Sequence, residues 1–469
     1  MSFADFPLDV VLELTKELDL PDAFHLAAVI IGRDFQTCSL CAEVLRSPYF
    51  WISALTRIEQ INRRPLPCVP GTELASLPLE TLREMAVHSG KLHRRWSSDL
   101  PRPASVHAFD LDNDVVGGRV LDLFPIEGTV MVVTVSLNRI VCWDTDSGEC
   151  LGFCDRAIDP TIEPWRNSVS SPFVYSGMCY IGFASCSDTQ LKFTMVQVDH
   201  RNLSMVDVSE IVAKAWIPPT GRIVSCVMVN SNTIAAIMTH DDGSSSLVFC
   251  RISDGLLRQF PLPVSTPPAV LSDALTVDDN FLVIEQSCAA SGPVFNVSST
   301  PSGELHAQKL ILPMSEPANE QQASSISSHN IRVPAYGVLN VTLRGTPHGA
   351  EGLANHLQFW PAEYQNSTLN LGSIVAFQHP VHRFIGCIAV GSSGTRVVWW
   401  RSNAEELGLV LYVCDPTPRV EFLPLPVPVE LQEMPDGSRL RCALDDRLGV
   451  VYFMACGEDR TRVVVISYV

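Results

Sequence analysis

The stretch "GTVMVVTVSLNRIVCWDTDSGECLGF", residues 128–153, sets out two short strands and two turns in one segment. Apolar residues, many of them β-branched, dominate positions 129–136 and 140–144, and such runs favour strands. Residues 137–139 and the pair Ser147–Gly148 interrupt these runs with the residue types of tight turns. The segment therefore predicts a strand at 129–136, a turn, a strand at 140–144 and a second turn.

The run "VCWDTDSG" within this stretch resembles the end of a WD repeat, with Trp143–Asp144 as the dyad. A second copy in the same frame is "VFCRISDG", where Cys250–Arg251 replaces the dyad and Asp254–Gly255 replaces Ser147–Gly148. Looser strands of this type are "FTMVQVD", "PVFNVSS", "HLQFWPAEY", "GLVLYVCD" and the final "RVVVISYV". Their spacing of about 45 to 65 residues is a plausible period for four-stranded blades.

From residue 104 onward, short apolar runs alternate with clusters of Gly, Pro, Asn, Asp and Ser, which predicts β structure throughout. We predict a mainly β chain with a multi-bladed β-propeller, seven blades being favoured over six. Such a ring needs its last strand covered, so we expect "RVVVISYV" to pair with an early strand at 104–109. A pair of β-sandwiches is the alternative, because only one WD dyad is present.

Residues 1–60 predict three short amphipathic helices. In "FPLDVVLELTKELDLPD", residues 6–22, Pro7 can occupy the first helical turn and Asp9 lies near the positive helix end. Leu20–Pro21 ends this helix and starts a second, and a third segment is broken at Pro48. So small a unit buries little surface, and we expect a partner to cover its remaining apolar face.

This helical segment resembles an F-box, with Phe6–Pro7 at the family's Leu-Pro opening, a leucine-rich helix, a second break and Trp51 near the end. Phe6 stands where Leu is usual, and the stretch between Val29 and Trp51 is longer than the common spacing. The resemblance implies docking to a Skp-family adaptor and, through it, to a cullin–RING ubiquitin ligase. The positions that match the adaptor-binding pattern are Phe6, Pro7, Leu8, Val11, Leu12, Leu14, Leu26 and Trp51. Each of them contacts either the adaptor or the other helices, and an unrelated helical cap is the alternative.

Residues 61–103 are predicted to be a linker with an amphipathic helix. "NRRPLPCVPGTEL" is Pro-rich and indicates a boundary. "SLPLETLREMAVHSGKLHRRWSS" places apolar residues on one helical face and ends in basic residues that complement the negative helix end. The predicted organisation is an F-box-like module at 1–60, the linker at 61–103 and the propeller at 104–469. We expect the module and the propeller to work independently.

Composition excludes several function classes. Lys plus Arg total 33 against 51 Asp plus Glu, and the net charge of −18 disfavours a nucleic-acid partner. No apolar run reaches the length of a membrane-spanning helix, and no secretory signal is recognised, so we expect no membrane partner. The fifteen cysteines are scattered through apolar runs, as free thiols are in a reducing compartment. We therefore expect a cytoplasmic or nuclear protein, or one found in both.

The sequence contains patterns that resemble metal-binding motifs, but each lacks residues that the metal requires. Cys38 and Cys41 have zinc-like spacing without a second pair nearby. "DLDND" alternates Asp110, Asp112 and Asp114 as a calcium loop does, but it lacks that loop's central Gly and terminal Glu. We predict no metal and no cofactor.

The sequence thus predicts a non-catalytic substrate receptor of a Skp–cullin–F-box ubiquitin ligase, with an unidentified client protein bound by the propeller. Two alternatives stay open. One is a WD-repeat-like scaffold that is not part of a ligase. The other is a propeller enzyme, because propeller active sites draw residues from distant blades.

Overall fold

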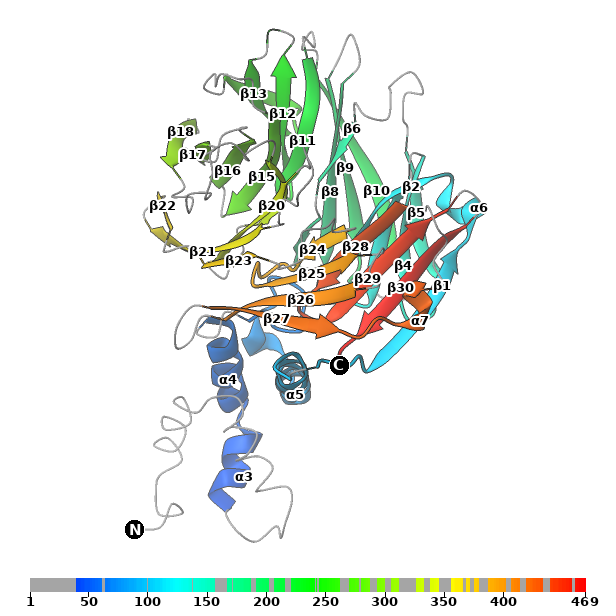
Figure 1. Ribbon diagram of the computed structural model, residues 1–469, viewed down its shortest axis with the longest axis vertical. Coiled ribbons are helices and arrows are strands. Elements are labelled where there is room, and N and C mark those ends of the chain that lie inside the picture. The colour runs from blue at the N-terminus through cyan, green and yellow to red at the C-terminus, as the bar shows by residue number, and fades with distance from the viewer. Residues whose placement is uncertain are drawn as a thin grey trace.

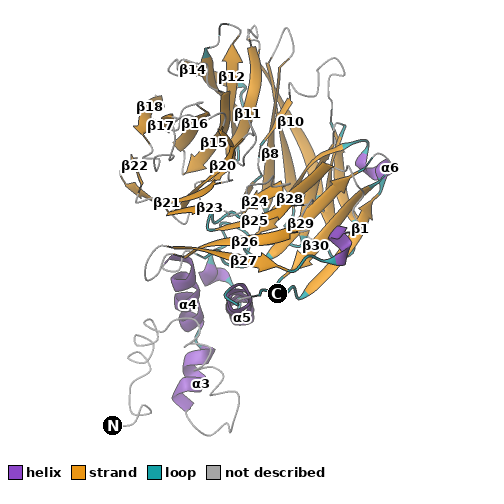
Figure 2. Ribbon diagram, in the orientation of Figure 1, coloured by secondary structure: helices purple, strands orange, loops and turns teal. Residues whose placement is uncertain are grey.

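In the computed structural model, the helices near the N-terminus lie at one end of the molecule and strands form most of the remainder (Figure 1, Figure 2). The structure describes residues 39–60, 64–98, 100–136, 138–156, 167–170, 172–186, 191–201, 206–215, 221–240, 242, 244–261, 270–277, 280–286, 293–299, 305–311, 326–332, 338–345, 356–365, 368–371, 375–378, 387–401, 406–413, 419–432, 439–457 and 460–469. The first two predicted helices therefore lie outside the described residues.

The helices near the N-terminus are α3 (Ser39–Arg46), α4 (Pro48–Gln60), a 3₁₀ turn η2 (Leu74–Ser76) and α5 (Leu79–Trp96). Pro48 begins α4 directly after α3 ends, so the predicted break at Pro48 is confirmed. Two four-residue helices, α6 (Asn113–Val116) and α7 (Val429–Gln432), lie between strands. Among the described residues, no helix is both long enough and apolar enough to cross a membrane.

The described strands form seven antiparallel sheets, each built largely from consecutive strands. The first is β2 (Val120–Pro125), β3 (Met131–Ser136), β4 (Arg139–Asp144) and β5 (Cys150–Asp155). The second is β6 (Asn167–Val169), β7 (Phe173–Tyr175), β8 (Met178–Cys186), β9 (Leu191–Asp199) and β10 (Asp207–Ala215). The third is β11 (Gly221–Asn230), β12 (Thr233–His240), β13 (Ser245–Arg251) and β14 (Leu256–Pro261).

The remaining sheets continue the same order. The fourth is β15 (Val270–Val277), β16 (Asn280–Gln286), β17 (Pro293–Ser299) and β18 (Leu305–Ile311). The fifth is β19 (Ile326–Arg332), β20 (Val338–Gly345), β21 (His356–Gln365), β22 (Thr368–Leu371) and β23 (Val375–Gln378). The sixth is β24 (Cys387–Val390), β25 (Arg396–Arg401), β26 (Glu406–Val413) and β27 (Arg419–Leu425). The last is β28 (Arg439–Asp445), β29 (Val450–Cys456), β30 (Thr461–Ser467) and β1 (Ser105–Leu111).

Each strand that the sequence singled out as repeat-like lies in a different sheet. They are β4, β9, β13, β17, β21, β26 and β30, and each is the third strand of its sheet when the first strand is taken as the innermost. Consecutive sheets touch through their first strands: β11 contacts β15, β15 contacts β19, β24 contacts β28 and β28 contacts β2. Successive four-stranded meanders arranged in this way are typical of a β-propeller, whereas two sandwiches would pack face to face.

The last sheet joins both ends of the β region. Strand β1 pairs antiparallel with β30 from Ser105 opposite Ser467 to Leu111 opposite Thr461. The predicted pairing of "RVVVISYV" with an early strand is therefore confirmed, and β1 extends two residues beyond the predicted range. Because β1 covers β30, the edge of β30 is not left open to other chains.

The stretch at 128–153 folds as predicted, with one shift. Strand β3 begins at Met131, because Gly128 and Thr129 form the turn from β2, with Gly128 at φ +75° and the Thr129 amide bonded to the Ile126 carbonyl. The indole N–H of Trp143 donates to Thr134 Oγ1 at 2.7 Å, which ties β4 to β3. The following turn is closed by the Asp144 carboxylate and by Gly148 at φ +73°.

Candidate functional site: the helical stem and its seat on the sheets

Helices α3, α4 and α5, with the connection 64–78, form a unit that we call the stem. Its core is closed by buried apolar side chains from all three helices and from the connection. They are Val44, Leu45, Phe50, Trp51, Leu55, Ile58, Leu66, Leu82, Met85 and Ala86. The apolar face predicted for the linker helix is thus buried, and its first half packs against α4.

Trp51 is the predicted adaptor-binding residue that the structure describes, and it lies inside the stem core with 5% of its surface exposed. Its indole N–H donates to the Leu45 carbonyl at 2.9 Å, and its ring meets Phe50 edge-on at 5.0 Å between centroids. Arg83 of α5 donates to the same Leu45 carbonyl at 2.8 Å. Leu45 lies in the last turn of α3, where carbonyls lack helical partners and a nearby cation is favourable. Trp51 and Arg83 therefore fix α3 to α4 and α5.

The other predicted adaptor-binding residues lie outside the described residues, so their role stays a prediction. They are Phe6, Pro7, Leu8, Val11, Leu12, Leu14 and Leu26. Cys38 and the side chain of Cys41 lie outside the described part as well. Asp112 caps α6 by accepting from the Asp114 amide, and Asp110 pairs with Arg460. The described residues contain no cluster of three His, Cys, Asp or Glu side chains arranged for a metal ion.

The second half of α5 belongs to a different core. Leu92 and Trp96 are buried among side chains of the last two sheets. The Trp96 ring meets Tyr468 edge-on at 5.9 Å, and the Arg396 guanidinium lies 4.5 Å above the Trp96 ring. Arg95 donates to the Tyr468 carbonyl at 2.9 Å. The first half of α5 is therefore buried in the stem core, and its second half is buried in the core of the sheets.

The Pro-rich connection packs across the turns that lead from the first to the second strand of neighbouring sheets. Arg447, between β28 and β29, donates to the carbonyls of Leu66 and Cys68 at 3.2 and 3.4 Å. A Cβ atom on Gly128, between β2 and β3, would lie 2.4 Å from the Cys68 carbonyl carbon. The Ser176 amide, between β7 and β8, donates to the Pro70 carbonyl at 3.2 Å. The Pro-rich stretch predicted as a boundary is therefore packed against the sheets, and the independence of the 1–60 module and the propeller stays a prediction.

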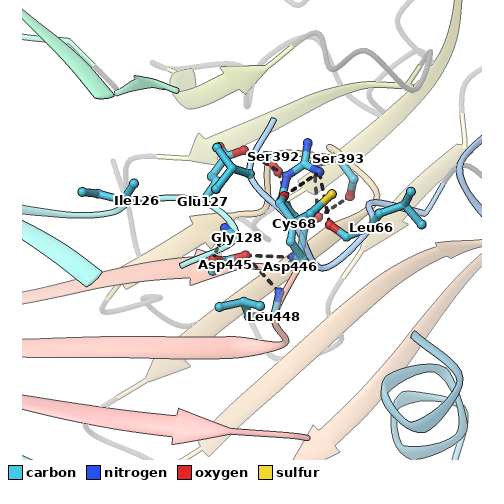
Figure 3. Close-up of polar contacts among 12 residues, drawn as sticks. Leu66, Cys68, Ile126, Glu127, Gly128, Ser392, Ser393, Asp445, Asp446 and Leu448 are labelled. Atoms are coloured by element: carbon cyan, nitrogen blue, oxygen red, sulfur yellow. Dashed lines mark hydrogen bonds and ion pairs between the residues drawn. The ribbon is translucent and has the colours of Figure 1, made fainter. Parts of the chain in front are cut away.

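We call the turns 126–130, 391–395 and 445–449 the seat, because they are hydrogen-bonded to one another and the turn 445–449 contacts the connection and α5. Figure 3 shows side chains from these turns gathered beside Leu66 and Cys68. Asp445 is fully buried and accepts from three backbone amides, those of Gly128, Arg447 and Leu448, at 2.8, 2.9 and 3.1 Å. One carboxylate thus links two sheets at the point where the connection crosses them.

Two further carboxyl groups lie beside Asp445. Glu127 forms an ion pair with Arg447, in which Oε2 of Glu127 lies 3.4 Å from Nε of Arg447. Only 12% of the Glu127 side chain and 9% of the Arg447 side chain are exposed. Asp446 accepts from the hydroxyl groups of Ser392 and Ser393 and from the Ser393 amide. Arg396 donates to the Asp446 carbonyl at 2.6 Å, which ties the seat to the residue that stacks on Trp96.

The electrostatics of the seat raise the pKa of Asp445 to about 7. Burial is the largest cause, because a charged carboxylate loses its hydration there, and the negative charges of Glu127 and Asp446 act in the same direction. The amides of Gly128 and Leu448 favour the ionised form and only partly offset these effects. Asp445 therefore changes its protonation state near neutral pH.

The seat was not predicted from the sequence, although a local signal indicates one of its turns. In "DDRLG" the Asp445 carboxylate accepts from the amides two and three residues later, and Gly449 follows at φ +71°. "DTDSG" has the same arrangement, with Asp144 as acceptor and Gly148 at φ +73°. Asp-x-x-x-Gly predicts the turn, but it carries no information about what packs on the turn.

Among solved structures, the chain is similar to the β-propeller domain of Cps50 (Swd1) from Myceliophteria thermophila, with 13% identity and a TM-score of 0.45 over 76% of this chain and 99% of that one. The WD40 domain of SCAP from fission yeast is 10% identical with a TM-score of 0.38, over 72% and 82% of the two chains. A complex of KlAtg21 with the coiled coil of AgAtg16 gives 10% and 0.41, over 73% and 96%. Because these identities and TM-scores are low, the fold is assigned from the strand pairing of this chain itself.

The sequence matches no known protein family and no curated protein. The strand order and the seat define a mainly β protein of the propeller type with a helical stem packed on one end of its sheets.

Proposed function

We propose that the chain is a substrate-receptor subunit of a Skp–cullin–F-box ubiquitin ligase. In this proposal the helices of residues 1–60 bind a Skp-family adaptor, residues 61–103 connect them to the sheets, and residues 104–469 form a closed seven-bladed propeller that binds a client protein. The protein holds the client and performs no chemistry, needs no cofactor, and works in the cytoplasm, the nucleus or both.

The observation that carries the proposal is the placement of α5 in two cores at once. Leu82 and Met85 lie in the stem core, whereas Leu92 and Trp96 lie in the core of the sheets. A receptor must hold its client at a fixed distance from the transfer machinery, because positioning of reactants is what such a subunit contributes. A stem that shares a buried helix with the client-binding domain supports that role better than a flexible linker would.

The F-box pattern supplies the second support. Pro7, Leu12, Leu14 and Trp51 match the family pattern, with Phe6 where Leu is usual, and Trp51 is buried in a stem core to which α3 and α4 both contribute. A pre-organised apolar helical surface loses little conformational entropy on binding, which favours use as a docking module.

An interaction scaffold outside any ligase is the second candidate. The same fold supports it, because a propeller offers broad loop surfaces for protein partners. The two candidates differ in whether the helices before α3 bind a ligase adaptor.

The test is affinity capture of a Skp-family adaptor and a cullin by the whole chain. Leu12→Asp and Leu14→Asp should each abolish capture, since an unpaired carboxylate in an apolar interface costs several kcal/mol. Val87→Asp is the matched control, because Val87 is 39% exposed on α5 and should leave capture unchanged. If the Leu12 and Leu14 variants capture the adaptor as the parent does, the receptor proposal fails and the scaffold remains.

A further inference from the structure

Asp445 differs from the other two carboxyl groups of the seat in its partners. Glu127 is paired with the Arg447 guanidinium, and Asp446 accepts two hydroxyl groups and one amide. The hydrogen bonds of Asp445 in the described part of the chain all come from uncharged backbone amides. An ionised Asp445 is therefore a third buried negative charge in a site where one guanidinium already serves Glu127.

The seat also holds the connection. Arg447 reaches the Leu66 and Cys68 carbonyls with the side chain that pairs with Glu127, and its own amide donates to Asp445. Gly128, whose amide also donates to Asp445, is in van der Waals contact with the Cys68 backbone. The residues that bind the Asp445 carboxyl are thus the residues that hold the stem.

We propose that Arg447 is the positioning residue that holds the stem on the sheets, and that its hold weakens when Asp445 loses its proton. This inference goes beyond the receptor role, because it concerns how the stem is attached, whatever the stem binds. Ionisation of Asp445 adds repulsion with Glu127 and Asp446 that is relieved when the connection lifts and water reaches the turn. The state with the connection docked is therefore favoured by the neutral carboxyl.

Three neighbouring ionisable groups, His88, Cys68 and Tyr452, have pKa values that burial shifts away from the charged form. Burial lowers the pKa of His88, which bonds to the Leu448 carbonyl, and so keeps it neutral near pH 7. Burial raises the pKa of Cys68 and of Tyr452, which stay protonated. The guanidinium groups of Arg396 and Arg447 keep their charge throughout. Asp445 is the group at this turn whose pKa is raised to about 7.

The direction and size of the effect follow from linkage. The pKa of Asp445 is about 7 when the connection is docked, against about 3.9 for a carboxyl in water. The docked state therefore binds the proton more tightly, so docking is strongest below pH 4 and weakens as the pH rises to about 7. Between pH 6 and pH 8 the population with a lifted connection should rise about tenfold.

The experiment is amide hydrogen exchange on the full chain at pH 6 and pH 8, corrected for the intrinsic rate at each pH. The reporter is the amide of Ser176, which donates to the Pro70 carbonyl and so joins the β7–β8 turn to the connection. Its protection should fall about tenfold in the parent protein. Arg447 uses Nη1 for the two carbonyls and Nε for Glu127, and the single nitrogen of Lys cannot hold both sides, so Arg447→Lys should lower the protection at both pH values.

The matched pair of variants is Asp445→Asn and Asp110→Asn. Asp445→Asn should remove the pH dependence, whereas Asp110→Asn, which breaks an exposed ion pair with Arg460, should keep it. If Asp445→Asn does not fold, Glu127→Gln supplies the test, because the loss of a like charge moves the same transition to lower pH. Equal protection at both pH values in the parent, or a pH dependence in Asp445→Asn equal to that of the parent, overturns the proposal.

Discussion

Replacing Trp96 by Ala tests whether the stem is part of the β domain. Trp96 is 2% exposed and packs on Tyr468, with the Arg396 guanidinium over its ring. Truncation of a buried Trp costs about 3–5 kcal/mol, and the lost cation–π contact adds about 1 kcal/mol or more. We therefore expect Trp96→Ala to lower the free energy of unfolding of the sheets by about 4–6 kcal/mol.

The assay is urea unfolding followed by far-ultraviolet circular dichroism, together with hydrogen exchange of the amides in β29 and β30. Trp96→Phe keeps a ring against Tyr468 and loses no hydrogen bond, because the Trp96 indole N–H meets no acceptor within the described residues. It should cost clearly less than Trp96→Ala. Val87→Ala, on an exposed position of the same helix, should change the free energy by at most about 0.5 kcal/mol.

The reasoning is refuted by two results. One is a loss below about 1 kcal/mol for Trp96→Ala, which would mean that the helix can leave the sheets without disturbing their core. The other is a large loss confined to the stem, with unchanged exchange protection in β29 and β30.

Three further outcomes follow from the same contacts. Removal of residues 462–469 takes away β30, leaves β1 unpaired and should lower the melting temperature of the whole β domain, so a truncated protein that melts like the parent would contradict the pairing. Gly128→Ala should lower the free energy of unfolding by about 2 kcal/mol more than Gly255→Ala. Both glycines have positive φ, but only a Cβ atom at Gly128 would clash with the connection. Equal denaturant midpoints for the two variants would contradict this. A fragment of residues 104–469 should unfold at lower temperature than residues 64–469, since only the longer one keeps α5 in its core; matching melting curves would count against that role.

Strands could be predicted where an apolar run, which indicates burial, is followed directly by turn-forming residues. In β4 and β13 an apolar β-branched run is followed by Asp and Gly at the turn, and both strands appear where the sequence places them. The boundary of β3 was missed because Thr129 and Val130 continue the apolar run while the backbone already turns at Gly128. The residue types indicate that a strand is present, but the hydrogen bonds of the preceding turn determine at which residue strand pairing begins.

The seat could not be predicted, because its members are distant in sequence. Helical periodicity identifies the buried face of α5 correctly, yet Leu82 and Trp96 are buried against different partners that no periodicity can name. In the same way, "DDRLG" predicts a turn but not the 381-residue separation between Arg447 and the carbonyl of Leu66. Local sequence patterns do not indicate which distant residues come into contact, and the stem is attached to the sheets by such long-range contacts.

The pairing of β1 with β30 has a consequence for the order of events during protein synthesis. Asp110 in β1 and Arg460, directly before β30, form an ion pair and are 350 residues apart. At about 5–20 residues per second, β1 leaves the ribosome roughly 20–70 s before its partner exists. During that interval an unpaired strand is available to other nascent chains. A chaperone that binds extended segments would be most needed in this window, and it would be released when β30 arrives.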